Sequence, residues 1–315
     1  MPTIVALGEM LIDFAPVAAD AAGYPTLKAQ PGGAPCNFLA ALQKYGCSTA
    51  MIGKVGDDRF GRLLVKTAAD CGIATEGIVM DASVFTTMAF VTLDAEGNRE
   101  FSFARKPGAD TCLTEHEVDY SLIDACRVFH FGTLSLTDEP ARTATQKAVA
   151  YAKTRGKLIS FDPNLRFPLW PDRDMLRGTV LQFLLLSNIL KISDEELEFL
   201  TGTADIESAL PQLFVGDVQL VLYTCGSSGA HAYTRTAHGF APCRKVRAVD
   251  TTGAGDGFIG SFLWQLERDG VTLEKLAKLS KTKLNEYLAF SNQFCGISVQ
   301  TNGAIDSYPT LSQMQ

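Results

Sequence analysis

Short runs of apolar residues alternate with amphipathic segments along most of the chain. The apolar runs are TIVALG at 3–8, RVFHFG at 127–132, KLISFD at 157–162 and VQLVLYT at 218–224. Runs of this length between turn residues are typical of strands buried on both faces of a parallel sheet. Between them, apolar positions with helical spacing predict helices at about 142–153 and 194–200. The alternation therefore predicts an α/β fold, in which helices cover a mostly parallel sheet.

One stretch breaks this alternation. VFTTMAFVTLD at 84–94 and REFSFA at 99–104 read as two strands on either side of a short polar turn, AEGN. This pattern predicts a β-hairpin at about 84–105 instead of a strand followed by a helix. A hairpin inserted into an α/β domain is a candidate lid over a site. The alternative is a decoration at the edge of the fold.

Composition and charge exclude several classes of protein. The chain has 315 residues, of which 46% are hydrophobic and 20% charged, and a formal net charge of -7. Without a basic block, a nucleic-acid partner is not expected. No apolar run approaches 18 residues and the start lacks a basic segment, so we expect a cytoplasmic protein without a membrane partner. The eight cysteines form no C-x-x-C motif, which favours free, packed thiols over a zinc site.

The glycine-rich stretch DTTGAGDGFIG at 250–260 is the strongest chemical signal. It contains G-x-G-x-x-G, the dinucleotide-binding pattern, and VRAV before it and FIGSFLWQL after it suit a strand and a helix. However, the acidic residue expected about 20 positions later is missing, since KLAKLSKTK at 275–283 reads as a basic amphipathic helix. The carboxylate of Asp256 would also repel a bound diphosphate. Gly257 and Gly260 are therefore expected to serve the packing of the helix.

The same residues suit phosphoryl transfer. Gly253, Ala254 and Gly255 can present backbone N–H groups as an anion hole, and Asp256 can act as general base for an attacking hydroxyl. The alternative is a plain turn at the start of a helix. The chain has no G-x-x-x-x-G-K-[ST] motif and no protein-kinase motifs, so it belongs to neither of those classes.

Taken together, these motifs resemble the ribokinase-like (PfkB) carbohydrate kinase family over nearly the whole chain. DTTGAGDGF resembles its C-terminal signature, PGGAPCN at 31–37 its N-terminal signature, and IGKVGDDRFG follows at the usual spacing. Fructokinases are the most similar members, through the stretches GEMLIDF, SFARKPGAD, FDPNLRFPLW, LKISDEELEFLTG and NGAIDSYPT. The resemblance implies a single ribokinase-like domain over 1–315 with a three-layer α/β/α core and a small β-lid at about 14–31 and 84–108. It also implies ATP-dependent phosphorylation of a sugar hydroxyl.

The resemblance also implies a set of catalytic and sugar-binding residues. The implied catalytic residues are Asp256, Gly253, Ala254 and Gly255. The implied sugar ligands are Asp13, Gly32, Gly33, Asn37, Phe101, Phe103, Arg105 and Arg166. A carboxylate can accept bonds from two sugar hydroxyls, and the planar fork of arginine suits oxygen acceptors. The alternatives are a turn residue at Asp13, a helix cap at Asn37, surface arginines at 105 and 166, and lid packing by the phenylalanines.

A nucleotide site and two metal sites follow from the same resemblance. The implied nucleotide-binding residues are Lys191, Ser193, Thr224, Gly226, Gly229 and Asn292, with ATP as cofactor; Lys191 could instead be an exposed lysine. Glu196 occupies the acidic position associated with Mg²⁺. The implied monovalent-cation site, for K⁺, comprises Asp250, Thr252, Ser298, Thr301, Gly303 and Ser307. Because no Arg or Lys precedes the glycine of FCGISVQTNG, this tail departs from the usual fructokinase pattern. A homodimer through the lid is also implied.

Several functions stay open at this stage. Fructose is the leading acceptor, at O6 before O1, and 2-keto-3-deoxygluconate, ribose and a nucleoside-like riboside are its rivals. A sugar or nucleotide sensor without catalysis is an alternative of another class, but a sensor has no need of the base Asp256. A dinucleotide-dependent oxidoreductase is the third alternative.

Overall fold

The four apolar runs form strands β1 (Ile4–Leu7), β8 (Val128–Phe131), β9 (Leu158–Phe161) and β11 (Leu220–Thr224) of one nine-stranded sheet. The computed structural model describes residues 1–93 and 99–314. The sheet order is β13-β12-β11-β10-β9-β8-β1-β4-β5. Its other members are β4 (Thr49–Gly56), β5 (Ala74–Asp81), β10 (Ile189–Ser193), β12 (Ala230–Tyr233) and β13 (His238–Ala241). Within the described residues of this sheet, the pairs β11–β12 and β12–β13 are antiparallel and the other six are parallel, so the predicted mostly parallel sheet is confirmed.

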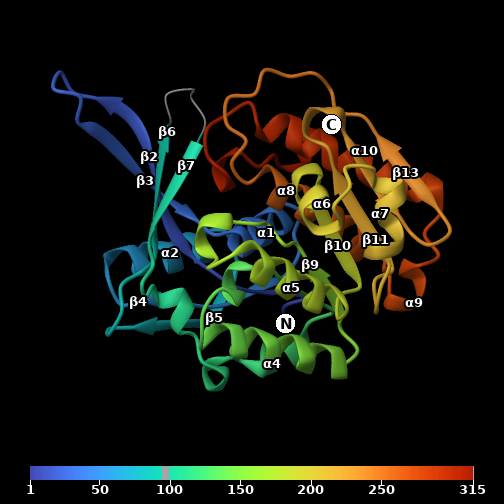
Figure 1. Cartoon of the computed structure of the whole chain (residues 1–315), viewed down its shortest axis with the longest axis horizontal. Coiled ribbons are helices and arrows are strands. Elements are labelled where there is room, and N and C mark those ends of the chain that lie inside the picture. Colours follow the sequence, from blue (N-terminus) through green and yellow to red (C-terminus); the bar gives the residue numbers. More distant parts are fainter. Residues whose placement is uncertain (94–98, 315) are drawn as a thin grey trace.

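Helices cover both faces of this sheet (Figure 1). Residues of α1 (Ala34–Gln43), α2 (Arg59–Asp70), α8 (Ala254–Arg268), α9 (Leu273–Leu276) and α10 (Lys281–Ser298) join one apolar cluster. Residues of α3 (Tyr120–Ala125), α4 (Ala141–Thr154), α5 (Arg173–Leu184), α6 (Asp194–Thr201) and α7 (Ile206–Leu213) join a second cluster. The helices predicted at 142–153 and 194–200 are α4 and α6, and the three-layer core is confirmed.

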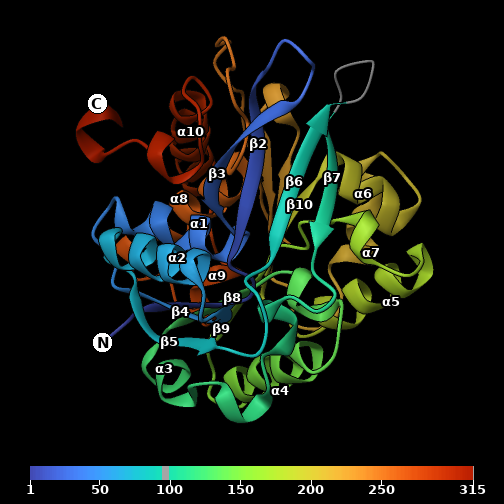
Figure 2. The ribbon, with the colours of Figure 1, turned by 90° about the vertical axis from the view of Figure 1, so that its left-hand side faces the viewer.

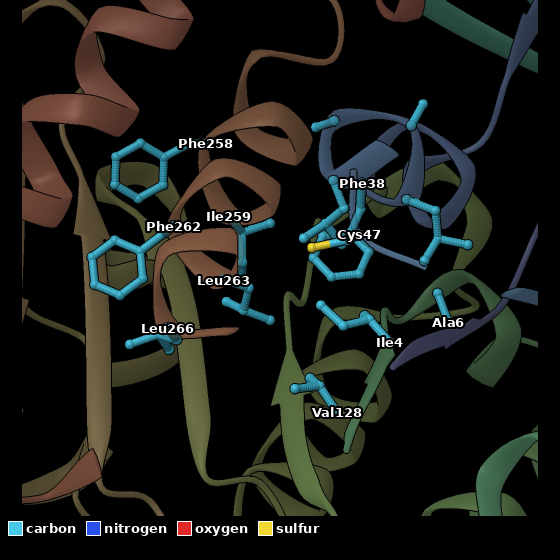
Figure 3. Packing of buried hydrophobic residues seen from close by; sticks show 14 of the residues in the cluster. Ile4, Ala6, Phe38, Cys47, Val128, Phe258, Ile259, Phe262, Leu263 and Leu266 are labelled. Atoms are coloured by element: carbon cyan, nitrogen blue, oxygen red, sulfur yellow. The ribbon is translucent and has the colours of Figure 1, made fainter. Parts of the chain in front are cut away.

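The central strand β1 shows why its sequence is apolar without alternation. Ile4 and Ala6 belong to the first cluster, together with Phe38 of α1, Phe262 of α8 and other side chains (Figure 3). Val5 and Leu7 belong to the second cluster, and all four β1 residues are 0% exposed. Successive side chains of a strand point to opposite faces, so a strand covered on both sides needs apolar residues at every position.

A second, four-stranded sheet has the order β3-β2-β6-β7 and stands apart from the core (Figure 2). It consists of β2 (Leu11–Ala19), β3 (Pro25–Gly32), β6 (Met88–Leu93) and β7 (Arg99–Ala104). The antiparallel pairing of β6 with β7 confirms the predicted hairpin, and the polar turn of that hairpin falls mostly within 94–98, outside the described residues. The two hairpins are joined by parallel pairing of β2 with β6, at Ile12↔Met88 and the next two pairs.

The predicted lid segments fall in this second sheet, and its closure over a site stays a prediction. So does the dimer through the lid, which sedimentation velocity at several protein concentrations can test. Val17 and Tyr24, at the tip of the β2–β3 hairpin, are 59% and 72% exposed. They are the side chains that a partner subunit would cover.

Within the described residues, no helix is both long and apolar enough to cross a bilayer. All eight cysteines are free thiols.

Two local predictions were wrong. VRAV is not a strand: residues 242–249 form no regular element, because β13 ends at Ala241 and the chain then runs across to the start of α8. KLAKLSKTK is not one helix: α9 ends at Leu276, and α10 begins at Lys281 after the N-cap Ser280, whose side chain accepts from the Lys283 N–H. The serine hydroxyl competes for backbone donors and so starts a new helix.

Candidate active site

The glycine loop leads directly into α8 and places Asp256 in the first turn of that helix. Gly253 is the N-cap, with φ 73°, a left-handed conformation that costs glycine nothing. Its carbonyl accepts from the Tyr308 hydroxyl at 2.7 Å, which fixes the turn. The backbone N–H groups of Ala254 and Gly255 lie at the N-terminus of α8, where the helix dipole favours an anion. The Ala254 N–H already donates to the Thr251 carbonyl at 3.1 Å.

The other two glycines of the stretch serve packing, as predicted. A Cβ on Gly257 would collide with the Phe294 ring, and a Cβ on Gly260 would lie 2.8 Å from Cβ of Ala41. Both faces of α8 thus touch neighbouring helices closely. The G-x-G-x-x-G match is accidental, because its last two glycines face the interior.

Asp256 lies in a buried hollow at the carboxyl ends of three neighbouring strands. The hollow is lined by Glu9 after β1, by His130 and Thr133 in and after β8, by Asp162 and Asn164 after β9, and by Asp256. Asp256 is 9% exposed, and burial raises the pKa of its carboxyl group. Hydrogen bonding from Asn37 and the charges of Lys191 and Arg166 oppose that rise. Ligands of open α/β sheets bind at this edge.

Two amides hold the Asp256 carboxylate. Nδ2 of Asn37 donates to Oδ2 at 2.9 Å, and Nδ2 of Asn164 faces Oδ1 at 3.5 Å. Asn37 comes from α1, and its own Oδ1 is buried without a protein partner among the described residues. A buried acceptor without a partner is costly, so a ligand donor at this atom would satisfy it.

The sugar-binding residues predicted from the N-terminal signature meet around this hollow. Asp13 of β2 lies beside Gly32, where a Cβ would collide with its carboxylate, and Gly33 caps α1 with φ 119°. Burial raises the pKa of Asp13 to about 6, while Arg166 lowers it and Asp256 raises it. The sequence-distant residues Asp13, Arg166 and Asp256 are therefore close enough to influence one another.

The lid-side predictions have mixed outcomes. Phe103 packs against the small apolar cluster of Leu11, Ala89 and Leu134 beneath the lid, and the side chain of Phe101 lies outside the described residues. Arg105 is 6% exposed, and all three of its guanidinium nitrogens are engaged. Nε donates to Asp110 at 2.8 Å, NH1 to Thr137 at 2.7 Å and NH2 to the Leu134 carbonyl at 2.8 Å. Arg105 is thus a tether at the base of the lid, not a surface arginine, and a sugar contact would require it to exchange a partner.

Lys191 is not an exposed lysine. It lies in β10, is 6% exposed, and its Nζ is 3.2 Å from the carboxylate of Asp162. A Cβ on Gly255 would lie 3.2 Å from Nζ, so the ammonium group lies close to the first turn of α8. Burial lowers the pKa of Lys191, but the carboxylates of Asp162, Glu196 and Asp256 outweigh burial and raise it. Lys191 is therefore a fixed positive charge beneath the loop.

Ser193 and Glu196 form the start of α6. The Ser193 hydroxyl accepts from the Glu196 N–H, and the Glu196 carboxylate accepts from the N–H groups of Ser193 and Leu165, each at 2.9 Å. This is a capping box. Both Glu196 oxygens thus have backbone donors, which favours an indirect role toward a metal ion, through water.

The predicted nucleotide turn follows β11. Gly226–Ser228 forms a helical turn after Thr224, and a Cβ on Gly229 would collide with the Ala241 carbonyl. Asn292 of α10 donates to that same carbonyl at 2.7 Å. The turn after β11, the end of β13 and α10 therefore meet at one place, beside the loop that leads to Gly253.

The predicted cation-site residues also lie together. Asp250 accepts from Thr252 N–H at 2.9 Å and from Gly303 N–H at 3.0 Å. Ser298 and Ser307 share a hydrogen bond at 2.6 Å, and the Thr301 hydroxyl donates to the Ser298 carbonyl at 3.4 Å. The segment after α10 thus folds against the loop before α8 and brings several oxygen atoms near one carboxylate.

Sequence reasoning missed Glu9, His130, Asp162 and Asn164. Each lies at or just after the end of a buried strand, and ligands of open α/β sheets bind at this edge, so the strand ends were the signal that could have found them. Burial raises the pKa of Glu9 to about 7, although the Ala34 N–H donates to its Oε1 at 2.9 Å. Burial lowers the pKa of His130 to about 3, so its ring is neutral, stacked on Phe38 and bonded to Ser160.

Comparisons with known proteins agree with this geometry. Residues 1–311 match the pfkB family carbohydrate kinase model. The chain is 42% identical to fructokinase-1 of Zea mays over 99% of this chain and 96% of that one. Its fold is similar to that of fructokinase from Xylella fastidiosa with bound ATP, with a TM-score of 0.92, 32% identity and coverage of 99% and 96%. Fructokinase from Vibrio cholerae O395 with fructose, ADP and calcium ion bound has a TM-score of 0.87, 30% identity and coverage of 99% and 97%.

The fold and the site define a phosphotransferase that acts on a sugar hydroxyl. The chain belongs to the pfkB family of carbohydrate kinases.

Proposed function

We propose that this chain is an ATP-dependent fructokinase in which Asp256 is the general base. The observation that carries this proposal is the position of Asp256. Its carboxylate is buried, and the residue lies in the first turn of α8, directly after Ala254 and Gly255. The base and the anion hole are therefore adjacent. A hydroxyl between them can lose its proton to Asp256 while it attacks a γ-phosphoryl group at the helix N-terminus.

The sugar lies in the hollow beneath the second sheet. Asn37 uses its amide N–H on Asp256, so its buried Oδ1 is available to accept a sugar hydroxyl. Asp13 offers a second acceptor, and the Arg166 guanidinium group, whose charge acts on both Asp13 and Asp256, is a candidate donor. Gly33 packs against the Glu9 carbonyl, from which a Cβ would lie 2.5 Å, and so holds the start of α1 beside the residues that follow β1. The apolar cluster under the lid excludes water, which would otherwise compete as phosphoryl acceptor.

The nucleotide is held along the turn at Gly226–Ser228 and the start of α8. The γ-phosphoryl group meets the Gly255 N–H group and the Lys191 ammonium group, which oppose the charge that develops on its oxygens. The Ala254 N–H donates to the Thr251 carbonyl at 3.1 Å and would have to leave it to join them. This stabilisation is strongest where water is excluded, because the local dielectric constant is low there.

The donor set also fits a divalent ion bound with the nucleotide. Within residues 1–93 and 99–314, no three His, Cys, Asp or Glu side chains form a metal cluster. Mg²⁺ typically keeps several waters and relies on one or two carboxylates and on substrate phosphates. Glu196 and Asp162 suit that mode of binding. When bound, the ion would neutralise charge on the β- and γ-phosphate oxygens.

The direct test is a coupled ADP-release assay over a panel of acceptors. We expect fructose to give the highest kcat/KM, and NMR of the product to show the phosphate at O6. A preference for 2-keto-3-deoxygluconate, ribose or a riboside would keep the kinase assignment and change the acceptor. Tight sugar binding without ADP release would indicate a sensor.

The KM for the sugar is expected to rise as the pH falls below about 6. The pKa of Asp13 is raised to about 6 by burial. Its carboxylate is therefore the charged acceptor above that pH, and protonation below it removes the charge. Steady-state KM values for fructose from pH 5 to 8 would measure this. In Asp13→Asn the pH dependence of KM should disappear, and a wild-type dependence in that variant would contradict the assignment.

We also propose that K⁺ binds beside Asp250 and stimulates turnover. The Asp250 carboxylate and the oxygen atoms of Thr252, Ser298, Thr301, Gly303 and Ser307 provide the hard donors that such a cation needs. We expect turnover to be higher in KCl than in NaCl or choline chloride at equal ionic strength. Asp250→Asn should remove the difference. Equal rates in all three salts for the wild-type protein would rule out the stimulation.

A further inference from the structure

Asn164 is the one described non-glycine residue with a positive φ, 45°. This left-handed conformation is uncommon outside glycine, although asparagine tolerates it better than most residues. Asn164 lies in the loop between β9 and the short turn Phe167–Leu169 and lines the same hollow as Asp256. Unusual backbone conformations of this kind cluster at functional sites.

The amide of Asn164 has a fixed orientation. NH1 of Arg166 lies 2.7 Å from Asn164 Oδ1, and a guanidinium group can only donate. The atom that faces Arg166 must therefore be the carbonyl oxygen, and the NH2 group faces the other way, toward Oδ1 of Asp256 at 3.5 Å. Contacts at catalytic groups are often long without substrate and tighten in the complex.

The two asparagines therefore act on different oxygens of the base. Asn37 reaches Asp256 Oδ2 from α1, and Asn164 reaches Oδ1 from the loop after β9. One donor allows a carboxylate to rotate about its terminal bond, whereas donors on both oxygens fix its plane. The same loop continues to Leu169, which packs against the apolar cluster of Leu11, Ala89 and Leu134 beneath the lid. The loop that carries Asn164 therefore contacts Asp256, holds Arg166 and packs against the second sheet.

We propose that Asn164 is a positioning residue that, held by Arg166, fixes the plane of the Asp256 carboxylate for proton transfer. This proposal rests on the proposed role of Asp256 as general base. Under this proposal Arg166 also orients the Asn164 amide, besides any contact with the sugar. Loss of the arginine would allow that amide to rotate.

Two variants separate the amide from the backbone. Asn164→Gly tolerates the positive φ and removes only the side chain, so the fold should be kept. We expect kcat to fall by about 10- to 100-fold, the cost of a small misplacement at a reacting group, with little change in the KM for ATP. Asn164→Asp keeps the shape and the Arg166 contact but replaces the donor by a carboxylate.

The pH profile supplies a readout that a merely structural role would not move. Asp256 must be deprotonated to act, so any change that raises its pKa shifts the acid limb of kcat, measured at saturating sugar and ATP, to higher pH. Loss of the Asn164 donor should raise that pKa, and a second carboxylate should raise it further. The expected order of the acid limb is wild type, then Asn164→Gly, then Asn164→Asp at the highest pH.

Asp256→Asn distinguishes the two possible failures. If that variant keeps normal turnover, the proposed base is wrong, and the role of Asn164 falls with it. If Asp256→Asn is inactive but Asn164→Gly keeps both the wild-type kcat and the wild-type acid limb, Asn164 does not position the base and only the present proposal is overturned. Thermal melting of each variant would confirm that it is folded.

Discussion

Asp256→Asn is expected to lower turnover by at least about 100-fold, the low end of what general-base catalysis contributes. The amide has almost the same shape as the carboxylate but cannot accept a proton from the attacking hydroxyl. Nearly unchanged binding of ATP and fructose, measured by calorimetry, should accompany the loss. The single side-chain oxygen of an asparagine can accept from Asn164, and Asn37, whose Oδ1 has no partner among the described residues, can turn to accept from its NH2 group, so the fold should persist.

A matched control is Asp174→Asn, which makes the same change in the first turn of another helix, α5, at an exposed position. That variant should keep wild-type turnover. Normal turnover in Asp256→Asn would contradict the proposed mechanism directly, because Asp256 is the carboxylate in the first turn of α8.

Lys191→Met is expected to reduce both stability and activity. Removal of one partner of a buried ion pair leaves the other charge uncompensated, which typically costs about 3–5 kcal/mol. Here the remaining group would be Asp162, which is 3% exposed and whose pKa burial already raises. The loss should therefore be largest above neutral pH, where Asp162 without Lys191 must either ionise or stay protonated at a cost. Urea unfolding at pH 8 would measure it.

The double variant Asp162→Asn with Lys191→Met separates the two effects. It leaves no buried charge at this pair, so much of the lost stability should return. Turnover should stay low, because the ammonium group beside the anion hole is still missing. If Lys191→Met is as stable as the wild type, the pair does not stabilise the fold. If the double variant regains turnover, Lys191 is not needed for phosphoryl transfer.

The sequence predicted the structure best at positions where the residue type is compatible with only one structural environment. Fully apolar β1 predicted a strand covered on both faces, and the crowded positions of Gly257 and Gly260 followed from their spacing on a helix. Asp256 was recognisable as a candidate base because a carboxylate in a loop expected to bind an anion would repel that anion unless it also took part in the reaction. These inferences depend on local sequence and on the general geometry of strands and helices.

Other features required the three-dimensional arrangement. Whether Arg105 reaches a ligand or a buried carboxylate depends on Asp110 and Thr137, which no local pattern places beside it. Lys191 was predicted to bind the nucleotide, with an exposed lysine as the alternative, and its burial depends on Asp162, which follows a neighbouring strand. The left-handed backbone of Asn164 occurs together with its contacts to Arg166 and Asp256, and Asp256 lies far away in the sequence, so DPNLR alone does not reveal this arrangement.

The parallel pairing of β2 with β6 has a mechanical consequence. The two lid hairpins come from separate parts of the chain, and without this pairing they would be two independent flaps. The backbone pairing that begins at Ile12↔Met88 joins the two hairpins into one sheet. Arg105, which follows β7 at the edge of that sheet, anchors it to the core. If this sheet moves over the site, the two hairpins should therefore move together. Single-molecule energy transfer from a dye on either hairpin to a dye on the core should then report the same change when fructose binds.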